Sequence, residues 1–432
     1  MQIIKQPAKD QWNEILQRPL LDNSALFGTV QSVLEDVKAN GDKAVKEYTQ
    51  KFDGASLTSL SVERSVISKA ASQVSDELKK AIQQAKLNIE KFHQAQIEGV
   101  ERIETMAGVV CWRKQVAIEK VGIYIPGGTA PLFSTVLMLG VPAKIAGCKE
   151  IVLCTPPSKD GQIDPAILYT AELIGIDKVY SVGGVQAIGA MAYGTESIPQ
   201  VYKIFGPGNQ YVTAAKQMVN QEGTAIDMPA GPSEVQVIAD ETAHPEFIAA
   251  DLLSQAEHGT DSQVILVSTN ENVLNDTMAA VDRQVAELPR KEIALKALDN
   301  SKAILLNSEQ EVVDLTNEYG PEHLIISTAN CDELAEQITN AGSVFIGHLT
   351  PESAGDYASG TNHTLPTNGF AKAYSGVSLD SFVKYITFQK INEEGIKALG
   401  PDIEIMAEAE QLRAHRNAVT VRLKHLTETQ GS

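Results

Sequence analysis

The feature that most constrains the fold of this chain is a series of short apolar runs, rich in β-branched residues, that alternate with helical stretches. Nine runs have the pattern of strands: 121–125, 150–154, 178–182, 201–205, 234–239, 262–268, 302–306, 323–327 and 342–346. Strands that alternate with helices are typical of parallel, doubly wound sheets with helices on both faces. Because nine strands are many for one sheet, we expect two α/β domains plus a helical remainder.

The two ends of the chain have a helical pattern instead. Ser75 can cap a helix in the first part. Its apolar residues recur at steps of three and four: Leu78, Ile82, Ala85, Ile89 and Phe92. The charged sequence from about residue 392 is also helical in pattern, and it follows the Gly/Thr/Asn-rich stretch 352–369. This stretch is long for a connector, so we interpret it as a functional loop.

Composition excludes several classes of protein. The chain has 36 Lys and Arg against 55 Asp and Glu, and its net charge of −19 disfavours binding to nucleic acid or to a membrane surface. The N-terminus lacks the apolar core of a signal peptide, and the most apolar stretch, 136–147, contains Lys144, so we expect no membrane span. The four cysteines fit neither a disulfide framework nor a zinc-binding CxxC pattern, and we interpret Cys148 and Cys154 as small buried apolar residues. These features indicate a cytoplasmic protein.

Turns rich in glycine directly follow three of the expected strands, at 126–128, 183–184 and 206–209. In open α/β sheets, ligands bind beyond the carboxyl ends of the strands, where helix N-termini offer N–H groups to anions. The phosphates of a nucleotide would suit these turns. None of them is a GxGxxG fingerprint, however, and for any one of them a tight turn without a ligand is an equally good explanation.

Polar side chains suggest a metal site. Gln255 and His258 are three residues apart at the end of an expected helix, so they project from one face and can hold two positions on a divalent cation. For this pair alone, a polar helix end is the commoner explanation. Asp356 and His363 lie in the polar stretch 352–369, whereas His415, by its spacing alone, is more often a packed residue than a ligand.

Glu322 and His323 place a carboxylate beside an imidazole where a turn enters a strand. Adjacent residues of an extended strand point in opposite directions, so both reach one site only if the turn twists them. An imidazole with a pKa of about 6.5 suits proton transfer at neutral pH. This pair is therefore a candidate acid–base pair.

Seven blocks of sequence resemble the histidinol dehydrogenase family, and the resemblance runs in the same order from about residue 20 to the tail. The blocks are GIYIPGGTAPLFSTVLML, VGGVQAIGAMAYGTE, IFGPGNQYVTAAK, DMPAGPSEV, DLLSQAEHGTDSQVIL, YGPEHLII and TPESAGDYASGTNHTLPT. Several of them exceed ten residues, so similarity of fold or chance does not explain them.

The resemblance implies an NAD-dependent, zinc-containing alcohol and aldehyde dehydrogenase. Such an enzyme oxidises L-histidinol through L-histidinaldehyde to L-histidine, the last step of histidine biosynthesis, with two NAD⁺ consumed in turn. The resemblance also implies one zinc ion per subunit and a homodimer in which each site is shared between chains. The implied fold is α/β, with two incomplete Rossmann-like, doubly wound domains and smaller helical N- and C-terminal segments.

We expect the following division of the chain. Residues 1–22 form an N-terminal helical segment, and 23–120 together with 233–377 form the first α/β domain, which carries most of the metal and acid–base residues. Residues 121–232 form the second α/β domain, on the NAD side. The helical tail 378–432 contributes to the partner's site.

The resemblance also assigns roles to single residues. It implies zinc ligands at Gln255, His258, Asp356 and His415, the last of these supplied by the partner chain, and an acid–base pair at Glu322 and His323. These ligands and His323 would also contact the substrate. The remaining implied positions are Ser233, His363 and Glu410 around the substrate, and Tyr124, Gln186 and Asn209 around NAD.

The residue types agree with these roles. A set of N and O ligands without cysteine, with positions left open, is typical of a metal site that binds substrate, although Mn²⁺ or Co²⁺ suits the same donors. Zinc has no redox chemistry, so the electrons must leave as hydride to a separate cofactor. Two alternatives remain: a metal-dependent hydrolase that uses Glu322 to activate water, and a two-lobed solute-binding protein. The first leaves the glycine-rich turns without a role, and the missing signal peptide counts against the second.

Overall fold

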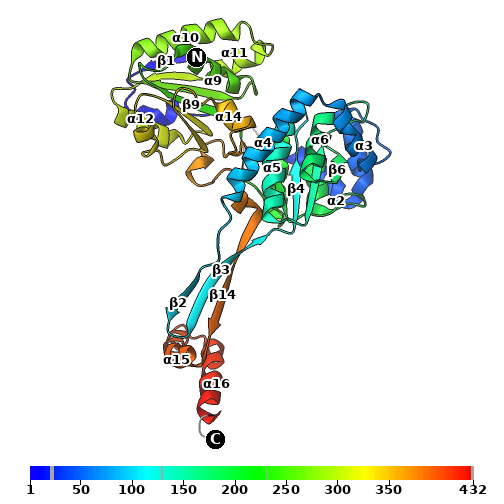
Figure 1. Ribbon diagram of the computed structural model, residues 1–432, viewed down its shortest axis with the longest axis vertical. Helices are drawn as coiled ribbons and strands as arrows, with labels where there is room; N and C mark the ends of the chain where they lie inside the picture. The colour runs from blue at the N-terminus through cyan, green and yellow to red at the C-terminus, as the bar shows by residue number, and fades with distance from the viewer. Residues whose placement is uncertain (20–23, 128–129, 230, 430–432) are drawn as a thin grey trace. The chain divides into compact units, whose positions relative to one another are not determined.

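The computed structural model divides the chain into two compact units (Figure 1). The structure describes residues 1–19, 24–127, 130–229 and 231–429. One unit comprises Met1–Gln96 and Ile118–Phe382, and the other comprises Ile97–Ala117 and Val383–Ser432. The first unit contains two parallel sheets, and the second contains an antiparallel sheet.

The larger sheet of the first unit has six parallel strands. Their order is β1 (Gln2–Lys5), β11 (Lys302–Leu305), β10 (Gln263–Ser268), β9 (Glu234–Ala239), β12 (His323–Ser327) and β13 (Ser343–Ile346). One face packs on α9 (Pro245–Ala256), α10 (Glu271–Val285) and α11 (Lys291–Asp299). The other face packs on α1 (Trp12–Ile15), α12 (Glu309–Tyr319) and α13 (Cys331–Ala335). Since helices cover both faces, the central strands β9, β10 and β12 are buried along their whole length.

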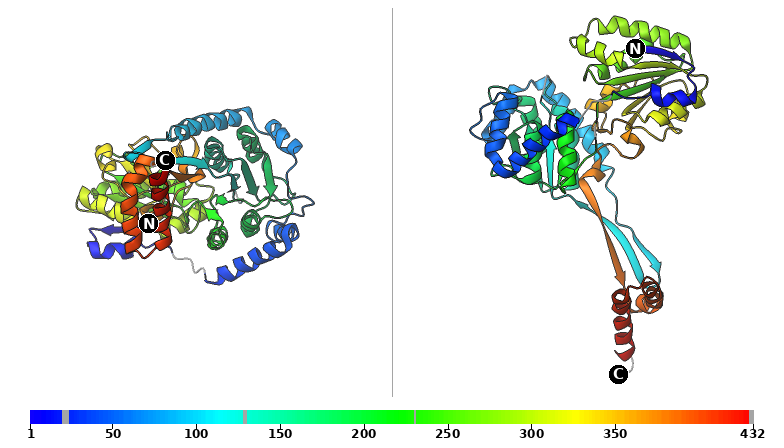
Figure 2. Two further views of the ribbon diagram at one scale, coloured as in Figure 1. Left: turned by 90° about the horizontal axis from the view of Figure 1, so that it is seen from below. Right: turned by 180° about the vertical axis from the view of Figure 1, so that it is seen from behind.

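The second sheet has five parallel strands. Their order is β6 (Lys178–Ser181), β5 (Glu150–Thr155), β4 (Lys120–Tyr124), β7 (Lys203–Phe205) and β8 (Ala225–Ile226). One face packs on α3 (Arg64–Ala70), α4 (Asp76–Gln94), α5 (Phe133–Ala146) and α6 (Pro165–Ile174). The other packs on α2 (Ser24–Asp53), α7 (Gly184–Tyr193) and α8 (Gln210–Gln221). The view from behind shows these helices (Figure 2).

The second unit is a three-stranded antiparallel sheet followed by two helices. The strand order is β14 (Val383–Ile391), β3 (Val109–Ala117) and β2 (Arg102–Met106), and the strands run side by side in Figure 1 and in the view from behind in Figure 2. The rings of Trp112 and Phe388 stack across β3 and β14, with centroids 5.3 Å apart. Helices α15 (Glu393–Ala409) and α16 (Arg413–Thr429) pack against each other.

The expected α/β fold class is confirmed, and all nine expected strands are present in the two parallel sheets. Helix α4 begins where expected, because the Ser75 side chain accepts a hydrogen bond from the N–H of Leu78. The prediction that Phe92 belongs to the buried apolar face of this helix is wrong, because Phe92 is 46% exposed, whereas the neighbouring His93 is fully buried. The ring of His93 takes the inward position because its Nδ1 donates to the backbone oxygen of Ile89 at 2.8 Å.

The structure differs from the expected domain boundaries near the N-terminus. Within 1–22, of which 20–22 lie outside the described residues, Gln2–Lys5 forms the edge strand β1 and pairs with β11. Residues 24–94 do not join 233–377 in one α/β domain. Their apolar faces instead pack on the helices and strands of the five-stranded sheet.

Two further expectations need correction. The tail 378–432 is not wholly helical, because β14 pairs along its whole length with β3, a strand that the sequence pattern did not indicate. The stretch 352–369 is not wholly a loop, because it begins with helix α14 (Glu352–Tyr357).

Cys148 and Cys154 are buried as expected, and desolvation raises the pKa of Cys148 to about 12. Among the described residues, none of the helices has the length and apolar character needed to cross a membrane.

Candidate active site

The candidate active site lies at the amino edge of the six-stranded sheet, where the neighbouring strands β9 and β12 begin. Glu322 and His323 enter β12 beside the point where Ser233 and Glu234 enter β9. The glycine-rich turns predicted a ligand site beyond the carboxyl ends of strands. In the six-stranded sheet, however, the titratable side chains of the candidate site lie at the amino edge.

Glu322 and His323 are both buried and reach one site. Oε2 of Glu322 lies 3.6 Å from Nδ1 of His323 and accepts a hydrogen bond of 2.8 Å from the backbone N–H of Glu234. Nδ1 of His323 lies 3.1 Å from the backbone oxygen of Glu234, to which it donates when protonated. The turn before β12 therefore brings together two side chains that an extended strand would separate.

Gln255, the next-to-last residue of α9, is fully buried against this pair. Its Nε2 lies 3.2 Å from the backbone oxygen of Glu234, 3.4 Å from Oε2 of Glu322 and 3.2 Å from Nδ1 of His323. Its Oε1 is buried and has no hydrogen-bond partner in the described part of the chain. Since an unsatisfied buried acceptor is costly, a bound cation at this oxygen would be stabilising.

Helix α14 adds two carboxylates, Glu352 and Asp356, which lie on one face because they are four residues apart. Oδ1 of Asp356 lies 3.6 Å from Nε2 of His323. One ligand atom from each of Glu352, Asp356 and His323 lies within 4.8 Å of the other two, so the three can hold one metal ion. Sequence reasoning missed Glu352 because it treated this helix as a loop. The spacing to Asp356 would have been the signal.

Burial and charge shift the pKa values of this cluster. Desolvation opposes the charged form of His323, but the carboxyl groups of Glu352, Glu322 and Asp356 outweigh it and raise its pKa to about 10. Desolvation raises the pKa of Glu322 to about 7 and that of Glu352 to about 8. It also opposes ionisation of Asp356, but His323 outweighs it and lowers that pKa. Three carboxyl groups thus share one imidazole, an arrangement that a divalent cation would stabilise.

His258 and His363 lie close enough to Asp356 for its charge to act on both rings. His258 follows α9, which ends at Ala256 and not at His258 as expected. Part of its side chain is exposed, yet desolvation by the surrounding atoms lowers its pKa. Nδ1 of His363 donates to the backbone oxygen of Asp356 at 2.9 Å, and Nε2 lies 3.0 Å from Oγ1 of Thr135 on α5. Desolvation lowers the pKa of His363 as well.

Most of the expected metal, acid–base and substrate residues therefore meet in one place. The structure brings together Gln255, His258, Glu322, His323, Asp356 and His363, with Ser233 beside them at the start of β9. Glu410 and His415 belong to the second unit, where both side chains are exposed.

The residues present fit a zinc-type ion. Gln255 offers an unpartnered oxygen and Asp356 a carboxylate. His258 offers an imidazole whose lowered pKa keeps it neutral and able to bind a metal. All three donors are N or O atoms, as expected from the sequence.

A second candidate site is a cavity of about 1070 Å³ at the carboxyl edge of the five-stranded sheet. Tyr124, Gln186 and Asn209 all line it, together with Gly127 of the first glycine-rich turn. Gly128 of the same turn lies outside the described residues. A cavity of this size, beyond the ends of parallel strands, suits a large cofactor.

The cavity holds polar groups in fixed positions. The hydroxyl of Tyr124 accepts a hydrogen bond of 3.1 Å from the N–H of Gly184 at the start of α7, and burial raises the pKa of Tyr124 to about 12. Gln186 is fully buried, and neither of its side-chain polar atoms has a partner among the described residues. Asn209 caps α8 with its side-chain oxygen. Gly206 allows this turn to approach β4, since it has φ of +132° and any added Cβ would collide with the backbone oxygen of Tyr124.

The fold and the two sites define a class: an α/β protein with the parts of a dinucleotide-dependent dehydrogenase. It has a buried cluster of carboxyl and imidazole groups that can hold a metal ion on one sheet, and a cofactor-sized cavity on the other. The family model for histidinol dehydrogenase matches residues 16–423, and the chain belongs to this family.

Individual relatives agree with this family. The histidinol dehydrogenase of Bacteroides thetaiotaomicron is 63% identical over 426 residues, which cover 99% of this chain and 100% of that protein. The histidinol dehydrogenase of Escherichia coli K12 is 52% identical over 422 residues, which cover 97% of this chain and 96% of that protein. The crystal structure of histidinol dehydrogenase from Elizabethkingia anophelis has a TM-score of 0.97 and 59% identity, and the match covers 99% of both chains. These comparisons support neither a hydrolase nor a solute-binding protein.

Proposed function

We propose that the chain oxidises L-histidinol through L-histidinaldehyde to L-histidine, the last step of histidine biosynthesis. The reaction consumes one water and two NAD⁺ and forms two NADH. The observation that carries the proposal is the meeting of Glu322, His323 and Gln255 at the main chain of Glu234, in a chain of this family. Two groups for proton transfer and a metal ligand would thereby be available to one substrate.

Gln255, His258 and Asp356 would hold one zinc ion per subunit, with His415 of the partner subunit as a fourth ligand. When bound, zinc would supply a Lewis acid for the nitrogens of the substrate and would weaken the field of the carboxylates that raises the pKa of His323. Ser233, His363 and Glu410 would contact the substrate around it. Shared ligation requires a homodimer, which we propose as the active form, in the cytoplasm.

His323 would act as the base in both oxidations. Its Nδ1 faces the backbone oxygen of Glu234, so Nε2 is the atom that takes the carbinol proton as hydride leaves the same carbon. Glu322, with a pKa near neutral, would then take a proton from the water that attacks the aldehyde carbon. As the water oxygen adds, His323 returns the carbinol proton to the aldehyde oxygen, and the hydrate forms. His323 then takes a hydroxyl proton of the hydrate as the second hydride leaves. The carbon loses two hydrides and gains one oxygen.

Tyr124, Gln186 and Asn209 would bind the dinucleotide in the cavity of the five-stranded sheet. The nicotinamide supplies the hydride acceptor in both steps. The unpartnered amide of Gln186 and the neutral hydroxyl of Tyr124 suit the polar groups of such a ligand.

The test is NADH formation, followed by ultraviolet absorbance, with the purified zinc-loaded chain, L-histidinol and NAD⁺. We expect two NADH per histidine formed, and loss of the reaction after removal of the metal by a chelator. A hydrolase would act without NAD⁺, and a solute-binding protein would bind histidinol in a calorimeter without turnover. Either result, or the absence of NADH with zinc-loaded protein, contradicts the proposal.

A further inference from the structure

The main chain of Glu234 is the point at which three site residues meet. Its N–H donates to Glu322 at 2.8 Å, and its oxygen lies 3.1 Å from Nδ1 of His323 and 3.2 Å from Nε2 of Gln255. The side chain of Glu234 has no part in the reaction described above. A shift of its backbone would nevertheless displace both proton-transfer groups, Glu322 and His323.

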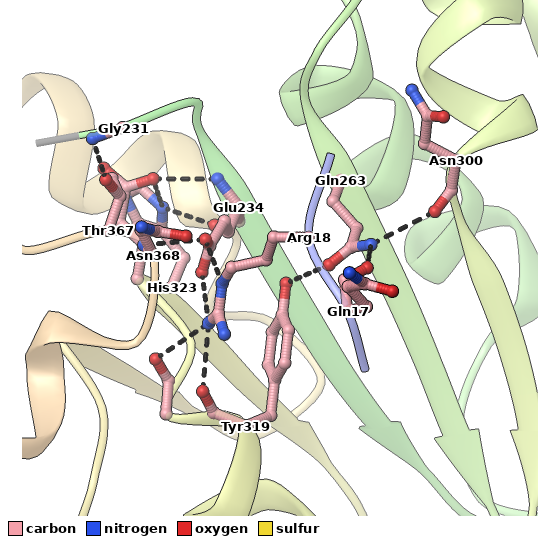
Figure 3. Close-up of polar contacts among 12 residues, drawn as sticks. Gln17, Arg18, Gly231, Glu234, Gln263, Asn300, Tyr319, His323, Thr367 and Asn368 are labelled. Atoms are coloured by element: carbon pink, nitrogen blue, oxygen red, sulfur yellow. Dashed lines mark hydrogen bonds and ion pairs between the residues drawn. The ribbon is translucent and has the colours of Figure 1, made fainter. Parts of the chain in front are cut away.

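The side chain of Glu234 is held by Arg18 of the N-terminal segment (Figure 3). Nε and Nη2 of Arg18 donate to the two carboxylate oxygens at 2.5 and 2.8 Å, and the N–H of Asn368 donates to Oε1 at 2.7 Å. The pair is enclosed, with 16% of the Arg18 side chain and 3% of the Glu234 side chain exposed. A two-pronged contact of this kind fixes direction as well as distance.

The same guanidinium also holds the turn that carries Glu322. Nη2 of Arg18 donates to the backbone oxygen of Tyr319 at 2.9 Å and lies 3.4 Å from that of Gly320. The guanidinium lies over the ring of Tyr319, 4.1 Å from its centroid. Tyr319 and Gly320 end α12 and lead into Glu322, so Arg18 ties the start of β9 to the start of β12.

The segment that carries Arg18 is itself anchored to the sheet. Nε2 of Gln263, the first residue of β10, donates to the backbone oxygens of Gln17 and Asn300 at 3.1 and 3.2 Å. Its Oε1 accepts a hydrogen bond of 2.9 Å from the hydroxyl of Tyr319 (Figure 3). Arg18 is therefore fixed from both sides by buried polar contacts.

We propose that Arg18 and Glu234 are positioning residues for both oxidations, an inference that rests on the function proposed above. Their ion pair sets the backbone of Glu234 and the turn before β12, and so the direction in which Glu322 and His323 face the substrate. Neither side chain has a role in binding substrate or NAD⁺. Loss of the pair therefore slows proton transfer and leaves binding intact.

The test uses Arg18→Lys, Glu234→Gln and the double variant, each zinc-loaded and assayed below its own melting temperature. Histidinol reports on both oxidations, and histidinaldehyde supplied directly reports on the second. We expect kcat to fall about 10- to 100-fold with either substrate, because misplacement by a fraction of an ångström is enough for such a loss. The KM values for substrate and NAD⁺ stay near wild type. The double variant is no slower than the slower single variant, because both changes remove one interaction.

The matched control is Lys9→Met. Lys9 joins the same N-terminal segment to the same helix α12 through an exposed ion pair of 2.6 Å with Asp314, without contact to Glu234. This variant should keep the wild-type kcat. An equal loss in Lys9→Met would show that only docking of the segment matters and would overturn the inference.

Other outcomes also decide the question. A wild-type kcat in Arg18→Lys, or a loss seen only in KM, overturns the positioning role while the proposed function stands. A wild-type chain that forms no NADH from histidinol overturns both. If Glu234→Gln does not fold, the kcat and KM of Arg18→Lys test the inference without it, since this variant keeps the positive charge and loses only the two-pronged contact.

Discussion

Nε2 of Gln255 lies 3.2 Å from Nδ1 of His323, so the proposed metal ligand touches the proposed base. Both groups also face the backbone oxygen of Glu234. Because Nε2 of Gln255 contacts His323 and the backbone oxygen of Glu234, Oε1 is the side-chain atom of Gln255 that has no hydrogen-bond partner in the described part of the chain. In the proposed site, metal binding and proton transfer would therefore be coupled through a single side-chain amide.

Removal of this amide should affect both functions. Gln255→Ala is expected to lower zinc affinity and kcat, each by at least about 10-fold, because the metal loses a ligand and His323 loses a neighbour that orients its ring. Zinc per chain after dialysis against a chelator, together with steady-state kinetics, measures the two effects. A variant that loses activity but retains zinc at the wild-type affinity would contradict the assignment of Gln255 as a ligand.

His323→Asn should separate the two functions. We expect kcat to fall about 10²- to 10⁴-fold, because the general base is lost, while zinc content stays near wild type. His348→Asn is the control, since His348 lies at the opposite edge of the same sheet, 2.8 Å from Oγ of Ser327. Loss of zinc from His323→Asn would instead make His323 a ligand, together with Glu352 and Asp356.

Hybrid dimers test whether sites are shared between subunits. The exposed His415 belongs to the second unit, and His258 belongs to the first. Two inactive variants, His258→Ala and His415→Ala, should regain part of the wild-type activity when mixed, because one of the two sites in a hybrid then has all its ligands. If subunit exchange is demonstrated by mass spectrometry and activity does not return, all zinc ligands lie on one chain.

Tyr124→Phe should weaken cofactor binding alone. The change leaves the N–H of Gly184 without its acceptor at the start of α7, beside Gln186. We expect the KM for NAD⁺ to rise about 2- to 10-fold, the range for one lost hydrogen bond, with an unchanged KM for histidinol. Tyr202→Phe, at an exposed tyrosine, serves as the control. An increase in the histidinol KM of Tyr124→Phe would place this residue in the substrate site.

Much of the fold could be predicted because periodicity is a local signal. The runs 234–239 and 323–327 are rich in Val and Ile and buried throughout, as is typical of strands covered on both faces, and both are central strands. The partner of a strand or helix is not a local property. Gln2–Lys5 has too few residues to show the alternation of apolar and polar residues typical of a strand. The sequence of residues 24–94 does not indicate which sheet their apolar faces cover.

The site was predictable where residue types carry chemistry, as at Glu322 and His323. Glu234 and Arg18 were missed because their contribution depends on contacts between residues 216 positions apart, which no spacing reveals. Glu352 was missed for a different reason: its role follows from the helical turn that places it beside Asp356, in a segment whose glycines suggested a loop.

The buried ring of His93 makes the stability of the first unit depend on pH. His93 is fully buried near the end of α4, with Nδ1 donating to the backbone oxygen of Ile89, and desolvation lowers its pKa in the folded chain. In the unfolded chain, His93 has a pKa of about 6.5, so the unfolded chain takes up a proton at His93 more readily than the folded chain does. The contribution of neutral His93 is complete above that pKa and is lost progressively as the pH falls from it through the lower pKa of the folded chain.

His93→Leu keeps an apolar side chain of similar reach and cannot titrate. We expect the urea midpoint of unfolding to fall less between about pH 7 and pH 5 in this variant than in the wild type, because one proton-linked loss is absent. Circular dichroism at several pH values measures both midpoints, and their difference cancels the groups common to both proteins. Parallel curves for the two proteins would mean that His93 does not couple folding to protonation.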